Sequence, residues 1–580
     1  MIIRRHTDPE LSAALLAAGE SKLSPLIARL YAARRISPEH LDYRLQALAR
    51  PAEMAGMEQA VDLLLHAYEQ QSAIVVVADF DADGATSCAL LVRGLRAFGF
   101  HNIDYLVPNR FEHGYGLTPE IADQAVAKGC QLLITVDNGI SSIAGVAHAK
   151  SLGMQVLVTD HHLPPAQLPE ADAIIDPNLT ECGFPSKALA GVGVAYYLLL
   201  ALRSRFQSLG RDELPNMAQW LDLVALGTVA DMAQLDHNNR ILVSQGLARI
   251  RAGRAQPGVL ALIKIGGRDY RTLIAADLGF AVGPRLNAAG RLDDMATGIE
   301  CLLATTETSA QQLATALDSL NRERREIENE MQQQAFELMD EMLLDQQSAR
   351  FGEALFHPQW HQGVIGILAS RVKNRLHRPV IAFAPADKDR LKGSARSIDG
   401  VHIRDQLANL DVSHPGLLIS FGGHAMAAGL TIAAEKFDLF RQLFDQQVGE
   451  VLGGVQPGES YLSDGELTGQ QFGLPLALSI RDAGPWGNGF DSPRFDGQFQ
   501  LVSSRLVGDN HLQMVLRWPD SNRQVKAIAF GVADQFDLQP EQRLHLLYQP
   551  QINSWNGNNS AELLIERIYV DQPEIQQQNC

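Results

Sequence analysis

Short apolar runs alternate with longer amphipathic segments between about residues 46 and 300. Strand candidates lie at 74–78, 103–107, 132–136, 155–159 and 173–176. The segments between them, such as PEIADQAVAKG and GVAHAKSLG, have the pattern of helices that end at glycine. Strands that alternate with helices in this way predict an α/β domain with a mostly parallel sheet and helices on both faces.

The pattern changes between about 305 and 345, where the chain contains neither Gly nor Pro. Apolar positions recur there at three and four residues: Leu313, Leu317, Leu320, Ile327, Met331 and Leu338. This spacing predicts one long amphipathic helix. A free coiled coil is the alternative, but its apolar seam is interrupted at Arg324. We interpret the helix as a connector between two α/β lobes.

The second lobe is predicted at 350–455 and contains the segment SFGGHAMAAG. Gly422 and Gly423 precede His424, and such small residues let backbone amides approach a phosphate closely. Taken alone, the segment is explained more simply by tight helix packing of small residues.

Residues 461–570 lack helical periodicity and contain about five strand-like segments: FQLVSSRLV, HLQMVLRW, VKAIAFG, HLLYQPQI and AELLIERIYV. A small five-stranded barrel of the OB type is the expected fold. Such barrels bind single-stranded nucleic acid by stacking bases on aromatic side chains. The candidates for stacking are Trp518, Phe530, Tyr548 and Trp555, of which some must belong to the core.

A chain of 580 residues is too long for one core and predicts three or four domains. We expect a helical appendage (1–45), a first α/β domain (46–304), the connecting helix (305–349), a second α/β domain (350–456), the barrel (457–570) and a disordered tail (571–580). The segment VQPGES at 455–460 has the composition of a linker.

The composition is that of a globular protein, with 46% hydrophobic and 20% charged residues. No apolar run approaches the ~20 residues that span a bilayer, and the N-terminus lacks the apolar core of a signal peptide. Five scattered cysteines form no C-x-x-C pair, which favours a reducing cytoplasm over a disulfide framework or a zinc ribbon.

The net charge of −18 argues against indiscriminate binding to nucleic acid, although a local basic channel can still attract it. Residues 371–396 supply a candidate channel, with eight basic residues against two acidic ones. A solvated face of alternating charge is the alternative explanation.

The first strand candidate, in IVVVADFDADGATS, leads into three alternate aspartates, Asp79, Asp81 and Asp83. We expect an acidic loop that ends at Gly84, followed by a helix that ends at Gly99. Ligands bind at the carboxyl ends of parallel strands, and three crowded carboxylates require a positive partner such as a divalent metal. An EF-hand loop is disfavoured because its twelfth position holds Leu90 instead of Glu. A structural acidic turn is the other alternative.

Three further acidic groups follow the same logic. Asp137 follows the strand at 132–136, Asp160 precedes His161 and His162 after the next strand, and Asp231 ends the apolar helix LDLVALGTVADM. A lone Asp at such a place is often only a helix N-cap. Together the groups place about six ligands at one sheet edge, which suits two metals that share a carboxylate. Mixed carboxylate and imidazole ligands suit Mn²⁺, with Mg²⁺ as the more available substitute.

At this point the sequence resembles the DHH phosphoesterase superfamily, whose motifs are similar to DFDADG, VDNG, DHH and GTVAD. Further segments resemble its RecJ-type single-strand-specific exonucleases: PNRFEHGYGL, GPRLNAAGRLDD, WHQGVIGILASR, KGSARS, SFGGHAMAAG and PWGNGF. The resemblance covers nearly the whole chain. One departure is Phe490–Asp491, where the family pattern has Asn-Pro, in a loop that we expect to lie far from the metals.

The fold expected from the resemblance is a DHH domain and a DHHA1-type domain joined by the long helix, with a C-terminal OB barrel. The expected metal ligands are Asp79, Asp81, Asp83, Asp137, His161 and Asp231. Asp137 is the candidate for the bridging carboxylate, and Asp160 is expected to orient a histidine. His162 would contact the substrate phosphate or protonate the leaving oxygen.

The resemblance also implies a pocket for a 5′-phosphate, made by Arg110, Ser394 and Arg396. Guanidinium groups form paired hydrogen bonds with phosphate, and Ser adds a short donor. A terminal phosphate held one nucleotide from the metals would give 5′→3′ release of 5′-mononucleotides. A groove too narrow for a duplex, lined by Arg285, Arg291 and His424, would explain a preference for single strands.

The resemblance implies roles in recombination and repair, with a single-strand-binding protein and a RecQ-type helicase as expected partners. We expect a monomeric enzyme. One alternative is a DHH phosphodiesterase for short oligonucleotides, cyclic dinucleotides or polyphosphate, but such enzymes do not need the C-terminal barrel. A DNA-binding scaffold without metals is the other, and the intact acids at all four motifs disfavour it.

Overall fold

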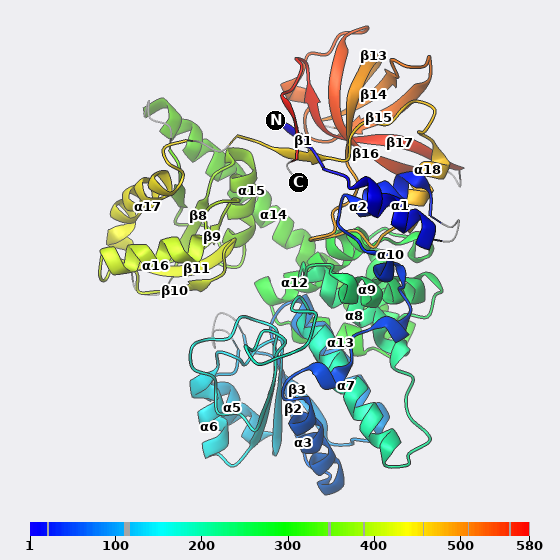
Figure 1. Cartoon of the computed structure of the whole chain (residues 1–580). Coiled ribbons are helices and arrows are strands. Elements are labelled where there is room, and N and C mark those ends of the chain that lie inside the picture. The colour runs from blue at the N-terminus through cyan, green and yellow to red at the C-terminus, as the bar shows by residue number, and fades with distance from the viewer. Residues whose placement is uncertain are drawn as a thin grey trace. The chain divides into compact units, whose positions relative to one another are not determined.

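The computed structural model describes residues 1–19, 23–109, 116–345, 350–386, 389–455, 458–508, 510–555 and 558–578. The chain forms two compact units (Figure 1). The first comprises Met1–Gly290, Asp294–Asp318 and Ser460–Cys580, and the second comprises Arg291–Asp293 and Ser319–Glu459. The long helix α14 (Glu307–Asp345) begins in the first unit and continues in the second, as the apolar spacing predicts.

The first unit contains a parallel sheet of five strands in the order β3-β2-β4-β5-β6. Its strands are β2 (Ile74–Ala78), β3 (Ile103–Leu106), β4 (Leu132–Val136), β5 (Gln155–Thr159) and β6 (Ala173–Ile175). All five predicted strands are confirmed to within one residue. The central strands β2 and β4 are buried along their whole length, which explains their unbroken apolar runs.

Helices cover both faces of this sheet (Figure 1). Helices α5 and α6 pack on the face formed by Val75, Val77 and Val158, while α3, α4 and α7 contact the sheet from the other side. The helices of the first unit, up to the start of α14, are α1 (Pro9–Ala18), α2 (Pro25–Ala32), α3 (Met57–Gln70), α4 (Ala82–Phe98), α5 (Pro119–Ala127), α6 (Ile143–Ser151), α7 (Gly191–Ser208), α8 (Leu221–Ala230), α9 (His237–Arg251), α10 (Pro257–Ile265), α11 (Ala275–Asp277), α12 (Gly283–Leu292, which ends in the second unit) and α13 (Ala296–Leu303).

Helix α4 begins earlier than the sequence predicts. The expected acidic loop up to Gly84 is wrong, because Asp81 is the N-cap and Asp83 already lies in the first helical turn. The Asp81 carboxylate accepts hydrogen bonds from the backbone N–H groups of Asp83 and Gly84, at 2.8 and 3.0 Å. Gly84 fits here because a Cβ atom would lie 2.3 Å from the backbone oxygen of Asp79.

The two ends of the chain also differ from the prediction. Strand β1 (Ile2–Arg4) pairs in parallel with β12 (Tyr461–Ser463) on one side and with β18 (Ile575–Gln577) on the other. The first residues are therefore more than a helical appendage, and part of the expected disordered tail forms a strand. Strands of three residues are too short to produce a periodic pattern.

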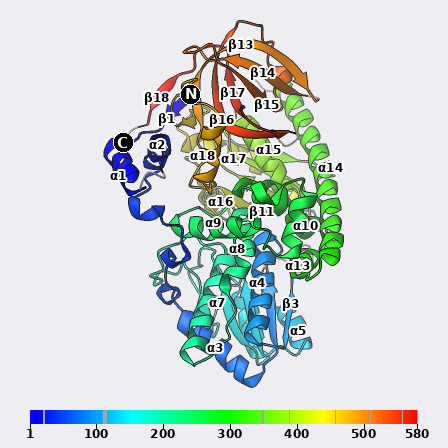
Figure 2. The same ribbon diagram turned by 90° about the vertical axis from the view of Figure 1, so that its right-hand side faces the viewer.

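The C-terminal region is a closed barrel in the order β13-β14-β15-β17-β16 (Figure 2). Its strands are β13 (Phe495–Val507), β14 (His511–Arg517), β15 (Gln524–Ala529), β16 (Arg543–Trp555) and β17 (Asn558–Tyr569). The predicted OB-type barrel is confirmed, although helix α18 (Leu474–Asp482) was not predicted. Trp518 and Tyr548 belong to the core, whereas Phe530 is 58% exposed. The side chain of Trp555 lies outside the described part of the chain.

The second unit contains a sheet in the order β10-β11-β9-β8-β7. Its strands are β7 (Glu353–Phe356), β8 (Val380–Pro385), β9 (Arg390–Arg396), β10 (Ser420–Gly423) and β11 (Ala427–Ala433). Its helices are α15 (Ile365–Leu376), α16 (Ile403–Ser413) and α17 (Phe437–Val451). The segment GGHAMAAG forms the hairpin of β10 and β11, so helix packing is the wrong explanation. Ala428, Leu430 and Ile432 are buried at every second position, as a strand requires.

Short helical turns complete the fold: η1 (Pro38–Leu41), η2 (Leu45–Ala47), η3 (Pro51–Glu53), η4 (Met217–Trp220), η5 (Tyr270–Thr272), the π-helical η6 (Leu278–Val282), η7 (Ala434–Lys436) and η8 (Ala533–Gln535). Arg324, which interrupts the apolar seam of α14, forms an ion pair with Glu328 at 2.7 Å. Within the described ranges, no helix is both long enough and apolar enough to cross a membrane.

Candidate functional site

The carboxyl edge of the parallel sheet brings together the acidic residues predicted from the sequence. Asp79, Asp137 and Asp160 follow β2, β4 and β5, which are neighbours in the sheet. Asp83 reaches the same place from the first turn of α4, and Asp231 from the end of α8. All of these residues except Asp231 are buried below 6% exposure, so bulk water solvates their charges poorly.

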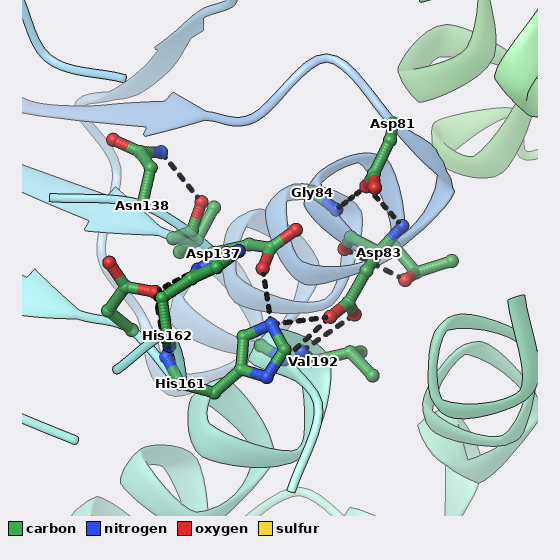
Figure 3. Close-up of polar contacts among 12 residues, drawn as sticks. Asp81, Asp83, Gly84, Asp137, Asn138, His161, His162 and Val192 are labelled. Carbon is green, nitrogen blue, oxygen red and sulfur yellow. Dashed lines mark hydrogen bonds and ion pairs between the residues drawn. The ribbon is translucent and has the colours of Figure 1, made fainter. Parts of the chain in front are cut away.

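His161 lies at the centre of this acidic site (Figure 3). Its Nε2 atom is 3.0 Å from Oδ1 of Asp137 and 3.9 Å from Oδ2 of Asp83. Three groups of residues each bring ligand atoms within 4.8 Å of one another: Asp137, His161 and His162; Asp83, His161 and Asp231; Asp79, Asp81 and Asp137. Asp137 and His161 each occur in two groups, and of these two residues only Asp137 has a carboxylate, whose two oxygens two ions can share.

Electrostatic repulsion among the acids of the site favours the binding of cations. Burial, and then the charge of Asp83, raises the pKa of Asp137 well above its ordinary value. The same two causes raise the pKa of Asp231. Carboxylates held together despite this cost are stabilised by bound cations. The residues therefore fit divalent metals on the chemistry of the donor set and on the convergence of their atoms.

Backbone donors hold the acids in place. Asp83 accepts hydrogen bonds from the N–H groups of Gly191 (2.6 Å) and Val192 (3.0 Å) at the start of α7. Asp137 has a φ of 61°, a left-handed conformation that few residues with side chains adopt. Next to it, the Asn138 amide donates to the backbone oxygens of Val77 and Val136 and so ties the ends of β2 and β4 together.

The two adjacent histidines have different surroundings. Burial lowers the pKa of His161 to about 4, so its ring is neutral and available as a ligand. Burial alone would also lower the pKa of His162, but a 2.7 Å hydrogen bond from Nδ1 to Asp160 raises it to about 9. Burial alone would raise the pKa of Asp160, and the His162 ring holds it below the ordinary value. Asp160 thus orients His162.

A second group of predicted site residues lies in the second unit, at the end of β9. The Arg396 guanidinium donates to the Ser394 hydroxyl at 3.1 Å. A Cβ atom on Gly366, at the start of α15, would lie 2.9 Å from Nη2 of Arg396 and 3.1 Å from the Ser394 hydroxyl. A guanidinium, a hydroxyl and a helix N-terminus meet here, and all three favour an anion.

The remaining residues predicted to bind substrate lie in different surroundings. Arg285 is buried and forms an ion pair with Asp318 of α14 at 2.8 Å, and its place in a substrate groove stays a prediction. Arg291 donates to the backbone oxygen of Gly363. His424 is exposed in the turn between β10 and β11. Arg110 lies outside the described residues, and its role stays a prediction.

The basic stretch at 371–396 is partly engaged in structural contacts. Arg371 forms an ion pair with Glu328 at 2.9 Å. The Arg375 guanidinium lies 4.0 Å from the centre of the Phe336 ring. Lys388 lies outside the described residues. Two of its basic residues are therefore engaged in contacts within the second unit, and the role of the stretch as a channel stays a prediction.

Several supporting residues were not predicted from the sequence. Asn287 accepts the Ala82 N–H at 2.8 Å and so fixes the first turn of α4. The Asn178 side chain donates to the backbone oxygen of His161. The motifs NAAG and DPN contain these residues, but nothing in their spacing shows which backbone atoms they reach.

The predicted position of the loop at 485–490 is wrong. It was expected to lie far from the metal ligands, but the Asn488 side chain donates to the backbone oxygen of Met232 at 2.7 Å. Met232 directly follows Asp231 in the sequence. The departure at Phe490 therefore lies in a loop that contacts the edge of the site.

Comparison with known domains identifies the architecture. The model of the DHH family N-terminal domain matches residues 73–228, that of the DHHA1 domain matches 349–450, and that of the RecJ OB domain matches 463–567. Together with the acidic sheet edge, these matches define a protein of the DHH class with an added OB barrel.

Whole-chain comparisons narrow this class. The chain is 51% identical over 558 residues to the single-stranded-DNA-specific exonuclease RecJ of Escherichia coli, with 95% of this chain and 96% of the relative covered. Identity to RecJ of Haemophilus influenzae is 50% over 552 residues, covering 94% and 96%. A crystal structure of Thermus thermophilus RecJ in complex with Mn²⁺ matches with a TM-score of 0.81 at 29% identity and covers 99% of this chain and 80% of that one. The chain belongs to the RecJ family.

Proposed function

We propose that the chain is a metal-dependent exonuclease that degrades single-stranded DNA from the 5′ end and releases 5′-mononucleotides. The observation that carries this proposal is the convergence of His161 Nε2 with Asp83, Asp137 and Asp231 at the sheet edge. The relatives of about 50% identity are described as single-stranded-DNA-specific exonucleases. Sequence matches over 94–95% of the chain support the same activity here.

The cofactors in this proposal are two Mn²⁺ or Mg²⁺ ions. Structures of Thermus thermophilus RecJ contain Mn²⁺ or Mg²⁺, and oxygen-rich donors with one imidazole suit both ions. The ligands in this chain are Asp79, Asp81, Asp83, Asp137, His161 and Asp231. Asp137 would be the carboxylate shared between the ions, because it occurs in two of the three ligand groups and has two carboxylate oxygens to offer. When bound, such ions lower the pKa of water and neutralise the oxygens of the phosphodiester.

The protein residues orient the substrate around these ions. Asp160 fixes the His162 ring, and we assign His162 to the substrate phosphate. Ser394 and Arg396, with the N-terminus of α15, bind the 5′-phosphate. Binding the terminal phosphate selects the end of the strand and therefore sets the 5′→3′ polarity.

The proposed exonuclease activity also suggests a role for the barrel, a cellular pathway and partner proteins. The OB barrel is proposed to bind single strands, with the exposed Phe530 as a stacking surface. We propose that the enzyme acts as a monomer in recombination and repair in the cytoplasm. A single-strand-binding protein and a RecQ-type helicase are the proposed partners. The free, buried thiols of Cys88, Cys130, Cys182 and Cys301 suit a reducing compartment.

The test is digestion of single-stranded DNA with Mn²⁺, with the label at either end. Immediate release of labelled mononucleotide from the 5′ end, with late loss of a 3′ label, is the expected result. Rapid hydrolysis of dinucleotides without digestion of long strands would move the assignment to small-substrate enzymes, and tight binding without cleavage would favour a scaffold.

A pair of matched variants ties this activity to the sheet edge. Asp79→Asn should reduce cleavage to below a few per cent, because it removes a ligand at nearly constant size. Asp123→Asn is the control, since Asp123 on α5 is exposed and forms an ion pair with His148 at the surface. Equal activity in both variants would refute the assignment of Asp79.

A further inference from the structure

The turn Trp486–Phe490, which precedes the barrel, contacts the loop that follows the metal-ligand candidate Asp231. The Asn488 amide donates to the backbone oxygen of Met232, and the backbone oxygen of Asn488 accepts the Leu235 N–H, both at 2.7 Å. The glycines on each side of Asn488 permit this approach. A Cβ atom on Gly487 would lie 2.8 Å from Leu235 Cδ1, and one on Gly489 would lie 2.4 Å from Gln234 Cγ.

The loop that this turn contacts has an unfavourable backbone conformation. Helix α8 ends in a Schellman motif, in which the Ala233 N–H donates to Thr228 O and the Met232 N–H donates to Val229 O. The left-handed position of this motif is usually Gly, but here Met232 occupies it with a φ of 60°. Asp231 is the residue immediately before, so its direction depends on this turn being held closed.

The contacting turn is itself firmly anchored. The Phe490 ring is buried and stacks on Trp486 with centroids 4.6 Å apart. The Arg240 guanidinium lies 4.6 Å from the centre of the Phe490 ring and donates to the backbone oxygen of Leu235. Arg240 therefore joins the turn and the loop, which gives Asn488 a fixed position from which to hold Met232.

We propose that Asn488 is a positioning residue for the metal site: it holds Met232 in its left-handed conformation and thereby aims the Asp231 carboxylate at the metal. This inference rests on the proposed role of Asp231 as a ligand. It assigns to the C-terminal region a second task besides DNA binding, which is to complete the metal site.

The experiment is calorimetric titration of the metal-free full chain with Mn²⁺. Asn488→Ala should weaken Mn²⁺ binding about tenfold, because supporting residues around metal ligands typically contribute at this level. Gly489→Ala tests the same contact independently, since its added Cβ pushes against Gln234. Asn102→Ala is the matched control, because its amide likewise donates to a backbone oxygen, that of Gln71, at the opposite edge of the sheet.

Titration of Asp231→Asn distinguishes a wrong ligand assignment for Asp231 from a wrong positioning role for Asn488. Unchanged Mn²⁺ binding in Asp231→Asn would remove Asp231 from the ligands and refute that part of the proposed function. Weaker binding in Asp231→Asn, but wild-type binding in folded Asn488→Ala or Gly489→Ala, would overturn the positioning role alone. Combining Asn488→Ala with Asp231→Asn should cause no further loss, and an additive loss would also contradict a role that acts through Asp231.

Discussion

Gly191 offers a sharp test of the geometry of the site. It is the first residue of α7, and its N–H donates to Asp83. A Cβ atom at this position would lie 2.6 Å from Cβ and 2.9 Å from Oδ1 of Asp137. Gly191→Ala therefore leaves the N–H donor intact but displaces the carboxylate that we assign as the bridging ligand.

The size of the effect follows from this contact. Carbon atoms pack at about 3.5–4.0 Å, so Asp137 must move by about 1 Å to accept the new methyl group. A misplacement of about 1 Å at a catalytic centre reduces the rate by about 100-fold. The substitution also improves helix propensity by at most about 1 kcal/mol, which limits any loss of stability.

Gly193→Ala is the matched control on the same helix. Its added Cβ would lie 2.9 Å from the Leu189 Cδ2 atom, which is the far end of an apolar side chain. It gains the same helix propensity without contacting a carboxylate. Release of mononucleotides from 5′-labelled single-stranded DNA should thus fall about 100-fold in Gly191→Ala and stay near wild type in Gly193→Ala.

One result would refute this reasoning. If folded Gly191→Ala, with an unfolding midpoint close to that of Gly193→Ala, cleaves DNA within about threefold of the control, Asp137 tolerates displacement. It could then not be a precisely placed bridging ligand, and the ligand assignment would have to be revised.

Three further predictions concern single charged groups. Asp137→Asn should raise the thermal unfolding midpoint in EDTA, because it removes a carboxylate that its neighbours repel and because Asn is favoured at a φ of 61°. The same variant should lose at least about 100-fold in nuclease activity. An unchanged or lower midpoint in calorimetry would contradict the expected stabilisation. Burial opposes the charge of Asp496, but hydrogen bonds from His545 and Arg4 lower its pKa to about 2. The charged Asp496 therefore contributes about 2.5 kcal/mol to the free energy of unfolding above pH 4, and this contribution is lost as the pH falls towards 2. Arg4→Met should flatten this pH dependence in urea unfolding, and an unchanged slope would remove Arg4 as a cause. Arg396→Ala should weaken binding of 5′-phosphorylated strands about tenfold more than of 5′-hydroxyl strands, whereas Arg390→Ala at the exposed start of β9 should affect both equally, as judged by fluorescence anisotropy.

The sequence predicts the sheets well because burial and geometry leave a direct pattern. A strand buried on both faces is apolar throughout, as in β2 and β4. A barrel strand alternates, as in β14, where every second residue is buried. Three-residue strands such as β1 and β18 lack both signals, since their pairing depends on where the rest of the chain places them.

In the candidate site, too, some residues could be predicted from local sequence patterns and others could not. Its acids were predictable because each follows a strand or helix whose end the topology brings to one edge, and this needs only local patterns. Their supports were not predictable, because Gly191, Asn287 and Asn488 act through one or two hydrogen bonds each, from segments more than 100 residues away from their partners. Yet the repulsion among the acids makes such supports necessary: buried carboxylates that raise one another's pKa would move apart unless backbone and amide donors held them. The turn at Asn488 shows how far this requirement reaches, since the segment that precedes the barrel helps to hold the edge of the metal site.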